Sequence, residues 1–250
     1  MFEKALFVLV AAAVLATLLL TGCAPKDKET VVVATDATRP PMEMVNEKKK
    51  IVGFDIDLME AIAKKGGFEV EFKNTAWDAM FVGLAAGQYD AVISSVTISE
   101  DRKKTMDFSD PYVNAGQVLI VGRDTKDVTE LADLGGESVG AQIGTTGAME
   151  IQKVSGVTLK TYDELGFAIE DLVAGRIAGV VCDTPIAADF ALQNENYKDK
   201  LKIVGEPFTE ELYGIAVKKG NTELLDKINA GLAAVQKAGT DEKLEKKWLR

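Results

Sequence analysis

Short apolar strands alternate with helical segments along nearly the whole chain, and this alternation limits the possible folds more than any other feature. Apolar, β-branched runs occur at 31–34, 68–72 and 89–95. Helical stretches at 55–65, with Asp55 as the expected cap, and at 78–86 separate them, and a glycine ends each stretch. Further strands are predicted at 117–121, 138–141, 157–159, 179–182, 201–204 and 213–217, and helices near 129–134, 146–154, 162–174, 185–193, 222–238 and 240–248. The alternation predicts an α/β protein with mostly parallel sheets flanked by helices.

One ten-residue pattern occurs twice. Residues 86–95 (AGQYDAVISS) and 174–183 (AGRIAGVVCD) share a helix end, a glycine, an apolar strand and a polar residue at the carboxyl end of that strand. In open parallel sheets ligands lie beyond the carboxyl ends of strands, so Ser95 and Asp183 are expected at the ligand-facing edges of two sheets. An α/β chain can repeat such a pattern by chance, but two lobes that face each other across a ligand explain it better.

The segment that follows the first copy carries groups that bind a small carboxylate. It reads SSVTISEDR from 94 to 102. Ser99 is predicted to cap a helical turn, and the unpaired backbone amides of such a turn attract anions. Arg102 adds a planar guanidinium that can bind a carboxylate through two hydrogen bonds. The alternative is that Arg102 pairs with Asp101 or Asp107 on a solvated turn.

The first residues form a targeting segment rather than part of the fold. An apolar run extends from 5 to 20, and LTGC at 20–23 resembles the lipobox of bacterial lipoproteins. Cleavage before Cys23 would make residues 1–22 a signal peptide and 23–30 a lipidated tether. An uncleaved anchor is the minor alternative, because the run is short for a spanning helix. The protein is therefore expected outside the cytoplasmic membrane, in the periplasm or at the cell surface, anchored by lipid on Cys23.

Charge and missing residue types argue against several functions. The formal net charge is −10, which argues against a nucleic-acid partner. The chain has no histidine, which excludes histidine triads and zinc sites built on them. Lipidated Cys23 would leave Cys182 without a disulfide partner. Asp55 and Asp57 lack the glycine and spacing of a calcium loop. Neither a metal nor a cofactor is therefore expected.

Several motifs together resemble the polar amino-acid family of extracytoplasmic solute-binding proteins that serve ABC importers, which includes glutamine-binding and lysine/arginine/ornithine-binding proteins. They cover nearly all of 31–248: TDAT (35–38), GFDIDL (53–58), SSVTISEDR (94–102), DFSDPY (107–112), GTTG (144–147), CDTP (182–185) and KKW (246–248). The resemblance implies a two-lobed, periplasmic-binding-protein-like fold of type II with two hinge crossovers, near 114–118 and 210–214. Lobe one would comprise residues 31–115 and 213–250, and lobe two residues 116–212.

The resemblance also implies how the main-chain groups of a ligand would be bound. Arg102 would bind the α-carboxylate, assisted by the backbone amides of Thr97 and Thr146. The run 144–147 opens a helix, which suits an anion independently of any family.

A second set of residues would bind the ammonium group and cover the side chain. Asp183 would bind the α-ammonium, together with the Ser95 carbonyl and the Thr97 hydroxyl, and Ser94 would lie beside them. The alternative for Asp183 is a surface aspartate or a helix cap. Trp77, in the loop before the second predicted helix, would form an aromatic wall. Its alternative is a simple core aromatic.

Three positions would contact the ligand side chain. Asp36 matches an acidic contact of the family to an amide or a cation, which favours glutamine or a basic amino acid. Arg39 departs from the aromatic residue often found at that position. Lining the pocket, Arg39 would repel lysine and arginine and favour an amide or carboxylate, whereas turned to solvent it would change nothing. Gln142 is a further candidate contact.

The sequence therefore predicts a monomeric binding protein, not an enzyme. It would close two lobes around a free L-amino acid, glutamine-like first and basic second, and deliver it to the permease of an ABC transporter. One alternative is a dehydratase-like enzyme on the same scaffold, for which Asp36 is the candidate carboxylate. A sensor ectodomain is the other alternative, although no second apolar span follows the body.

Overall fold

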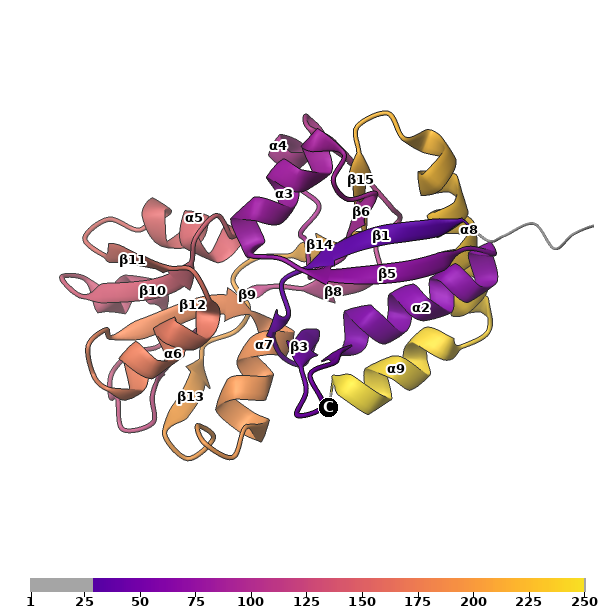
Figure 1. The fold of residues 1–250 in the computed structure, drawn as a ribbon. Helices are drawn as coiled ribbons and strands as arrows, with labels where there is room; N and C mark the ends of the chain where they lie inside the picture. The colour runs from indigo at the N-terminus through magenta and orange to yellow at the C-terminus, as the bar shows by residue number, and fades with distance from the viewer. Residues whose placement is uncertain (1–28, 250) are drawn as a thin grey trace, which may run out of the picture.

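Two five-stranded sheets carry the fold (Figure 1). The computed structural model describes residues 29–249, so the predicted signal peptide and Cys23 lie outside the described residues. The first sheet has the order β5-β1-β6-β15-β7 and contains β1 (Thr30–Thr35), β5 (Glu69–Asn74), β6 (Ala91–Val92), β7 (Met106–Phe108) and β15 (Ala216–Lys218). The second has the order β11-β10-β12-β9-β13 and contains β9 (Gln117–Gly122), β10 (Ser138–Gln142), β11 (Thr158–Tyr162), β12 (Gly179–Asp183) and β13 (Leu201–Val204).

The two sheets share one pattern of strand directions. In the first, β1 is parallel to β5 and β6, and β15 is antiparallel to β6 and β7. In the second, β10 is parallel to β11 and β12, and β9 is antiparallel to β12 and β13. The prediction of mostly parallel sheets is therefore wrong. Both sheets are mixed, because β9 and β15 each follow a short strand directly, without the helical crossover that parallel neighbours require.

The repeated ten-residue pattern occupies the same place in both sheets. Val33 of β1 pairs with Ala91, and Val139 of β10 pairs with Gly179. Ala91 and Gly179 are the sixth residues of the two copies. The structure thus confirms that the repeat is a structural one and not a coincidence of composition.

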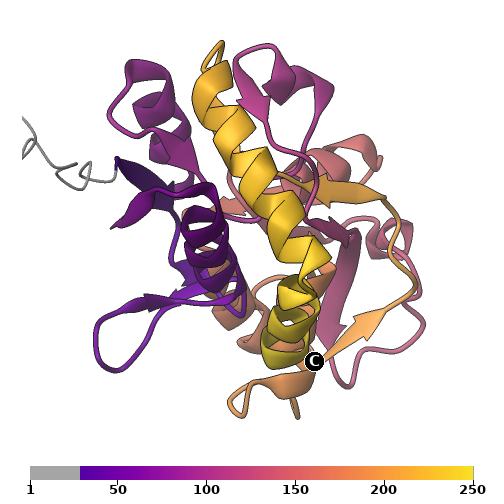
Figure 2. The same cartoon turned by 90° about the vertical axis from the view of Figure 1, so that its right-hand side faces the viewer.

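Helices cover both faces of the first sheet (Figures 1 and 2). On one face α2 (Phe54–Gly66) packs against α8 (Thr222–Lys237) and α9 (Thr240–Trp248), and on the other lies α3 (Trp77–Ala86). The short α4 (Glu100–Lys103) lies between β6 and β7 in sequence. Because α8 and α9 return to this sheet, it is built from both ends of the described chain.

The second sheet has its own helices. These are α5 (Thr146–Lys153), α6 (Leu165–Val173) and α7 (Thr184–Ala188), with a 3-10 turn at Leu131–Leu134. The helix predicted over 185–193 changes to a π-helical turn at Asp189–Gln193. Every helix within residues 29–249 falls short of the length and apolar content needed to cross a membrane.

Two short strands join the lobes. β8 (Val113–Ala115) pairs antiparallel with β14 (Glu211–Tyr213). The predicted strand 213–217 is in fact two strands, β14 and β15, because the chain turns at Gly214, where an added Cβ would lie 2.8 Å from the Ile98 side chain.

A small antiparallel sheet, which the sequence pattern did not reveal, precedes α2. It comprises β2 (Thr38–Arg39), β3 (Glu43–Val45) and β4 (Ile51–Val52). Gly53 follows it with φ 144°, and a Cβ there would lie 2.1 Å from the Met42 carbonyl oxygen. Gly53 is the N-cap of α2, so the prediction that Asp55 caps this helix is wrong.

Candidate functional site

Polar side chains from both lobes meet at the carboxyl ends of three strands. Asp36 follows β1, Gln142 ends β10 and Asp183 ends β12, and all three are buried. The Gln142 amide donates a hydrogen bond to Asp36 Oδ2 at 2.7 Å, which joins the lobes. Asp36 and Gln142 each lie three residues beyond the paired Val33 and Val139. They are therefore equivalent positions of the two lobes, brought face to face.

Arg39 extends from the first lobe into the second. Its guanidinium donates to Gln142 Oε1 at 2.7 Å and to Asp183 Oδ2 at 3.1 Å, and Glu43 Oε1 lies 3.6 Å from its Nε. Only 2% of Arg39 is exposed, so the alternative in which it turns to solvent is not what the structure has. Burial lowers the pKa of Arg39, but the Asp183 and Glu43 carboxylates outweigh this and raise the pKa overall. Arg39 is a buried, charged bridge between the lobes.

Trp77 forms an aromatic wall beside the two arginines. It is the first residue of α3 rather than a loop residue, because Ala76 is the N-cap. The guanidinium carbons of Arg39 and Arg102 lie 4.7 Å and 5.5 Å from the centre of its ring. The ring also packs edge-on against Phe81. Trp77 is thus both a core side chain and a face for cations, so its two interpretations are not exclusive.

Arg102 lies in α4, which Ser99 caps as predicted: the Ser99 hydroxyl accepts a hydrogen bond from the Arg102 amide at 3.3 Å. The guanidinium donates to the Thr97 carbonyl at 2.9 Å and to the Gly144 carbonyl, in the other lobe, at 3.4 Å. Burial lowers its pKa, although Asp183 partly opposes this.

The acidic neighbours of Arg102 in sequence are engaged elsewhere. Asp101 pairs with Lys104 at 2.6 Å, and Asp107 pairs with Lys219 at 2.6 Å. The solvated-turn alternative for Arg102 is therefore not what the structure has.

A hydroxyl cluster surrounds Glu211, a residue that the sequence analysis missed. Its Oε2 accepts hydrogen bonds from the Thr97 hydroxyl at 2.6 Å and the Thr146 hydroxyl at 2.8 Å. The Gln117 amide donates to Thr146 Oγ1 at 3.1 Å and to Asp183 Oδ1 at 3.0 Å. The structure thus brings together Thr97 and Thr146 through a carboxylate on β14, which the sequence gave no signal to find.

Two further buried carboxylates support the floor of the cleft. Asp55 Oδ2 accepts hydrogen bonds from the Ser95 amide at 2.7 Å and the Tyr112 hydroxyl at 2.9 Å. Glu43 Oε1 accepts one from the Ser94 hydroxyl at 3.0 Å. The Ser94 side chain is therefore used inside the first lobe, and Ser95 contributes its backbone there, with φ 52°.

This acid pair makes stability depend on pH. Burial raises the pKa of Asp55 to about 6 from an ordinary value of 3.8, and burial also raises the pKa of Glu43. A raised carboxyl pKa contributes stability that is present below about pH 4 and lost as pH rises through about 6. We expect the free energy of unfolding of Asp55→Asn, from urea titrations, to fall less than that of wild type between pH 5 and 7, by about 1 kcal/mol.

Asparagine keeps an oxygen that can accept from the Ser95 amide, so the variant tests the charge rather than the hydrogen bond. Asp226→Asn, at an exposed position of α8, is the matched control and should follow wild type. Parallel curves for Asp55→Asn and wild type would contradict the prediction.

The cleft has the chemistry to hold a small zwitterion. Arg39 and Arg102 supply positive charge, and Asp36, Asp183 and Glu211 supply negative charge, on elements of both lobes. Within residues 29–249 no group of three or more acidic or cysteine side chains is arranged to hold a metal ion.

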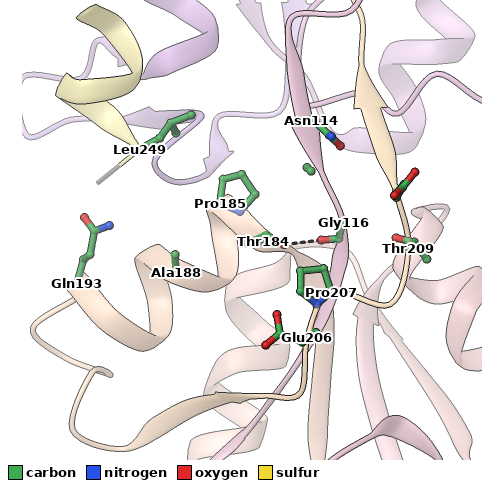
Figure 3. Close-up of a pocket in the computed structure, with 12 residues that line it drawn as sticks. Asn114, Gly116, Thr184, Pro185, Ala188, Gln193, Glu206, Pro207, Thr209 and Leu249 are labelled. Carbon is green, nitrogen blue, oxygen red and sulfur yellow. Dashed lines mark hydrogen bonds between the residues drawn. The ribbon is translucent and has the colours of Figure 1, made fainter. Parts of the chain in front are cut away.

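A separate cavity of about 570 Å³ lies beside the crossovers (Figure 3). Asn114 and Gly116 of the first crossover, Pro207 and Thr209 near the second, and Thr184 of α7 line it. The Thr184 hydroxyl donates to the Gly116 carbonyl at 2.8 Å. Its described lining has no arginine or lysine, so this cavity does not match the mixed-charge cleft.

Comparisons with known proteins agree with this geometry. Residues 31–250 match the family described as bacterial extracellular solute-binding proteins, family 3. The L-cystine-binding protein TcyJ of Escherichia coli (strain K12) is 35% identical over 226 residues, which cover 90% of this chain and 84% of that protein. An ancestral arginine-binding protein bound to arginine is 45% identical with a TM-score of 0.85, covering 90% of this chain and 100% of that one. An ancestral arginine-binding protein bound to glutamine is 46% identical with a TM-score of 0.84, covering 89% and 99%.

Proposed function

The chain belongs to family 3 of the bacterial extracellular solute-binding proteins and has their two-lobed, type II periplasmic-binding-protein fold, and from this we propose that it captures a free polar amino acid between its lobes and delivers it to the permease of an ABC transporter. The relatives reported above are named as binding proteins, and the proposal is one of binding rather than catalysis. The observation that carries it is the cleft of opposite charges, to which each lobe contributes both a carboxylate and a hydrogen-bond donor.

The main-chain groups of the amino acid would bind at opposite ends of the cleft. Arg102 would take the α-carboxylate with the Thr97 and Thr146 amides. The guanidinium now donates to backbone carbonyls, and a carboxylate would replace them with a stronger, charge-assisted pair. Asp183 would take the α-ammonium, together with the Ser95 carbonyl and the Thr97 hydroxyl.

Contacts to both lobes would favour the closed form over the open one. The crossovers near 114–118 and 210–214 would bend, and the lobes would comprise residues 31–115 with 213–250, and residues 116–212. Pairing of β8 with β14 in the crossovers supports a joint movement of the two segments.

The ligand side chain would lie between Asp36, Arg39 and Trp77, with Gln142 beside them. A side-chain amide matches this set, because its nitrogen can donate to the Asp36 carboxylate and its oxygen can accept from the Arg39 guanidinium. A second cation would be repelled by Arg39 at close range. We therefore place glutamine-like amino acids first and basic amino acids second.

A thermal-shift screen of the twenty amino acids tests the proposed function. A ligand that binds only the folded protein stabilises it by about 2.7 kcal/mol at 100 times its Kd, so Tm rises with ligand concentration. Glutamine should give the largest shift, and calorimetry should confirm one site per chain. If none of the twenty amino acids raises Tm, the proposed function is wrong.

Ligand binding should change the fluorescence of Trp77. Its ring lies against Arg39 and Arg102, whose contacts a ligand would rearrange. Trp248 lies on α9, where its indole donates to Asp57 at 2.8 Å, away from the cleft. We expect Trp77→Phe to lose most of the ligand-dependent change in emission, whereas Trp248→Phe, the matched control, should retain it. A full signal from Trp77→Phe would remove Trp77 from the cleft.

We further propose that the protein is a monomer anchored by lipid on Cys23 outside the cytoplasmic membrane. The basis is the LTGC motif at 20–23 together with the extracellular nature of the family. Cys23→Ser should then remain unlipidated and leave the membrane fraction if its signal peptide is still removed, as cell fractionation and intact-mass measurement would reveal. A wild-type protein that carries no lipid at Cys23 would contradict the anchor.

A further inference from the structure

The cleft contains a guanidinium that belongs to the protein itself. Arg39 lies over the Trp77 ring at 4.7 Å, donates to a carboxylate of Asp183 and donates to the side-chain oxygen of Gln142. An aromatic face, a carboxylate and an amide oxygen are the partners that a guanidinium from solution would use. Arg39 is also 2% exposed, so this compartment is already filled and closed to water.

We propose that Arg39 is a tethered competitor for ligand cations: its guanidinium occupies the cation compartment of the cleft, selects against lysine and arginine side chains, and leaves a binding site for free guanidinium compounds when it is removed. The inference rests on the proposed function only in assuming that the amino acid enters this same cleft.

The charges around Arg39 explain why the empty compartment would bind a cation. Asp183 and Glu43 lie at 3.1 Å and 3.6 Å from its nitrogens, and both are buried. The nearby Asp36 holds the Gln142 amide that also contacts Arg39. Without Arg39 these carboxylates would be left without their cation in a dry site, which is strongly unfavourable. A small planar cation from solution would restore the pairing.

The same bridge has a consequence for ligand entry. Asp183 cannot bind an incoming ammonium through Oδ2 while that oxygen accepts from Arg39, so binding must exchange one cation for another. Arg39 also spans from β2 to residues of the second sheet, so it favours contact between the lobes before any ligand arrives. Removing it should both empty the compartment and weaken this contact.

The test is the binding of methylguanidinium to Arg39→Ala. Tm and calorimetric heats are measured against methylguanidinium chloride at constant ionic strength, with tetramethylammonium chloride as the cation control. Arg39→Ala should show saturable binding and a rise in Tm, whereas wild type should show neither. Arg123→Ala, at an exposed arginine whose guanidinium donates to the Lys198 carbonyl, is the matched control and should behave as wild type.

The amino-acid preference gives an independent measurement. The affinity for L-arginine relative to L-glutamine should rise about tenfold or more in Arg39→Ala, because the repulsion between like charges is gone. Arg39→Gln, which is neutral but can still hydrogen-bond to Gln142, should change the ratio in the same direction. This second variant decides the proposal if Arg39→Ala does not fold.

The outcomes separate this inference from the proposed function. Folded variants that bind amino acids with an unchanged arginine-to-glutamine ratio and take up no methylguanidinium would overturn the inference while the proposed function stands. Uptake of methylguanidinium by Arg39→Ala, with no amino acid bound by wild type or variant, would support the compartment and overturn the proposed function.

Discussion

Arg102→Ala is expected to weaken amino-acid binding about 100-fold, or by about 3 kcal/mol, while the protein stays folded. The substitution removes a guanidinium that lies against the Trp77 ring and donates to carbonyls of both lobes, at Thr97 and Gly144. A ligand carboxylate would then be buried without its charged partner, which costs more than the loss of one neutral hydrogen bond. Isothermal titration calorimetry with the amino acid found in the screen measures the effect.

Two companion variants make this result specific. Arg102→Lys should recover only part of the affinity, because an ammonium cannot form the planar, two-bond pair. Arg176→Ala removes an arginine that pairs with Asp171 on the second lobe and should bind as wild type does. Unchanged affinity in a folded Arg102→Ala protein would mean that the α-carboxylate binds elsewhere.

Asp183→Asn is expected to lower affinity to a similar extent, about 100-fold. The side chain keeps its shape and can still bond to Gln117, but it no longer carries the charge that would pair with an α-ammonium. It also deprives Arg39 of its closest printed carboxylate contact, at 3.1 Å, so the bridge between the lobes weakens as well. The two effects act in the same direction, since both reduce the stability of the liganded, closed form.

Calorimetry combined with small-angle X-ray scattering distinguishes the two effects of this substitution. A larger radius of gyration for the unliganded variant than for wild type would report the loss of the bridge, and the Kd reports the loss of the ammonium contact. Asp199→Asn, at an exposed position of the second lobe, is the control. An Asp183→Asn protein that retains wild-type affinity would show that Asp183 does not bind the ammonium group.

Local signals in the sequence predicted most elements of the fold. Gly67 and Gly87 end α2 and α3 in the left-handed conformation, as their positions after amphipathic segments indicate. Strand β13 matches its predicted range, 201–204, to the residue. These features depend on neighbours close in sequence, which is why they are accessible without a structure.

Features that depend on distant neighbours were missed or misplaced. Asp55 is an acceptable cap by its residue type, but its carboxylate is used by the Ser95 amide, 40 residues away. Glu211 has no distinguishing pattern around it, and it reaches Thr97 across 114 residues. The position of Arg39 was left open because burial of an arginine is decided by its partners, Gln142 and Asp183, which lie 103 and 144 residues away.

The candidate site was more accessible than these details, because the repeated pattern and the ends of strands mark where ligands lie. Asp36, Thr97, Arg102, Thr146 and Asp183 all converge on one cleft. The resemblance supplied their individual roles, which stay predictions until ligand binding is measured.

The equivalence of the two sheets makes the cleft comparable to the contact between two subunits of a dimer, with the same backbone on each side and different side chains. Asp36 faces its counterpart Gln142, and Ser95 has Asp183 as its counterpart in the other lobe. Acid and amide could in principle change sides: Asp36→Gln combined with Gln142→Asp would preserve a donor and an acceptor between the lobes. The polarity of the cleft, and hence the direction in which a zwitterion lies in it, is therefore a property of a few exchangeable side chains and not of the backbone that presents them.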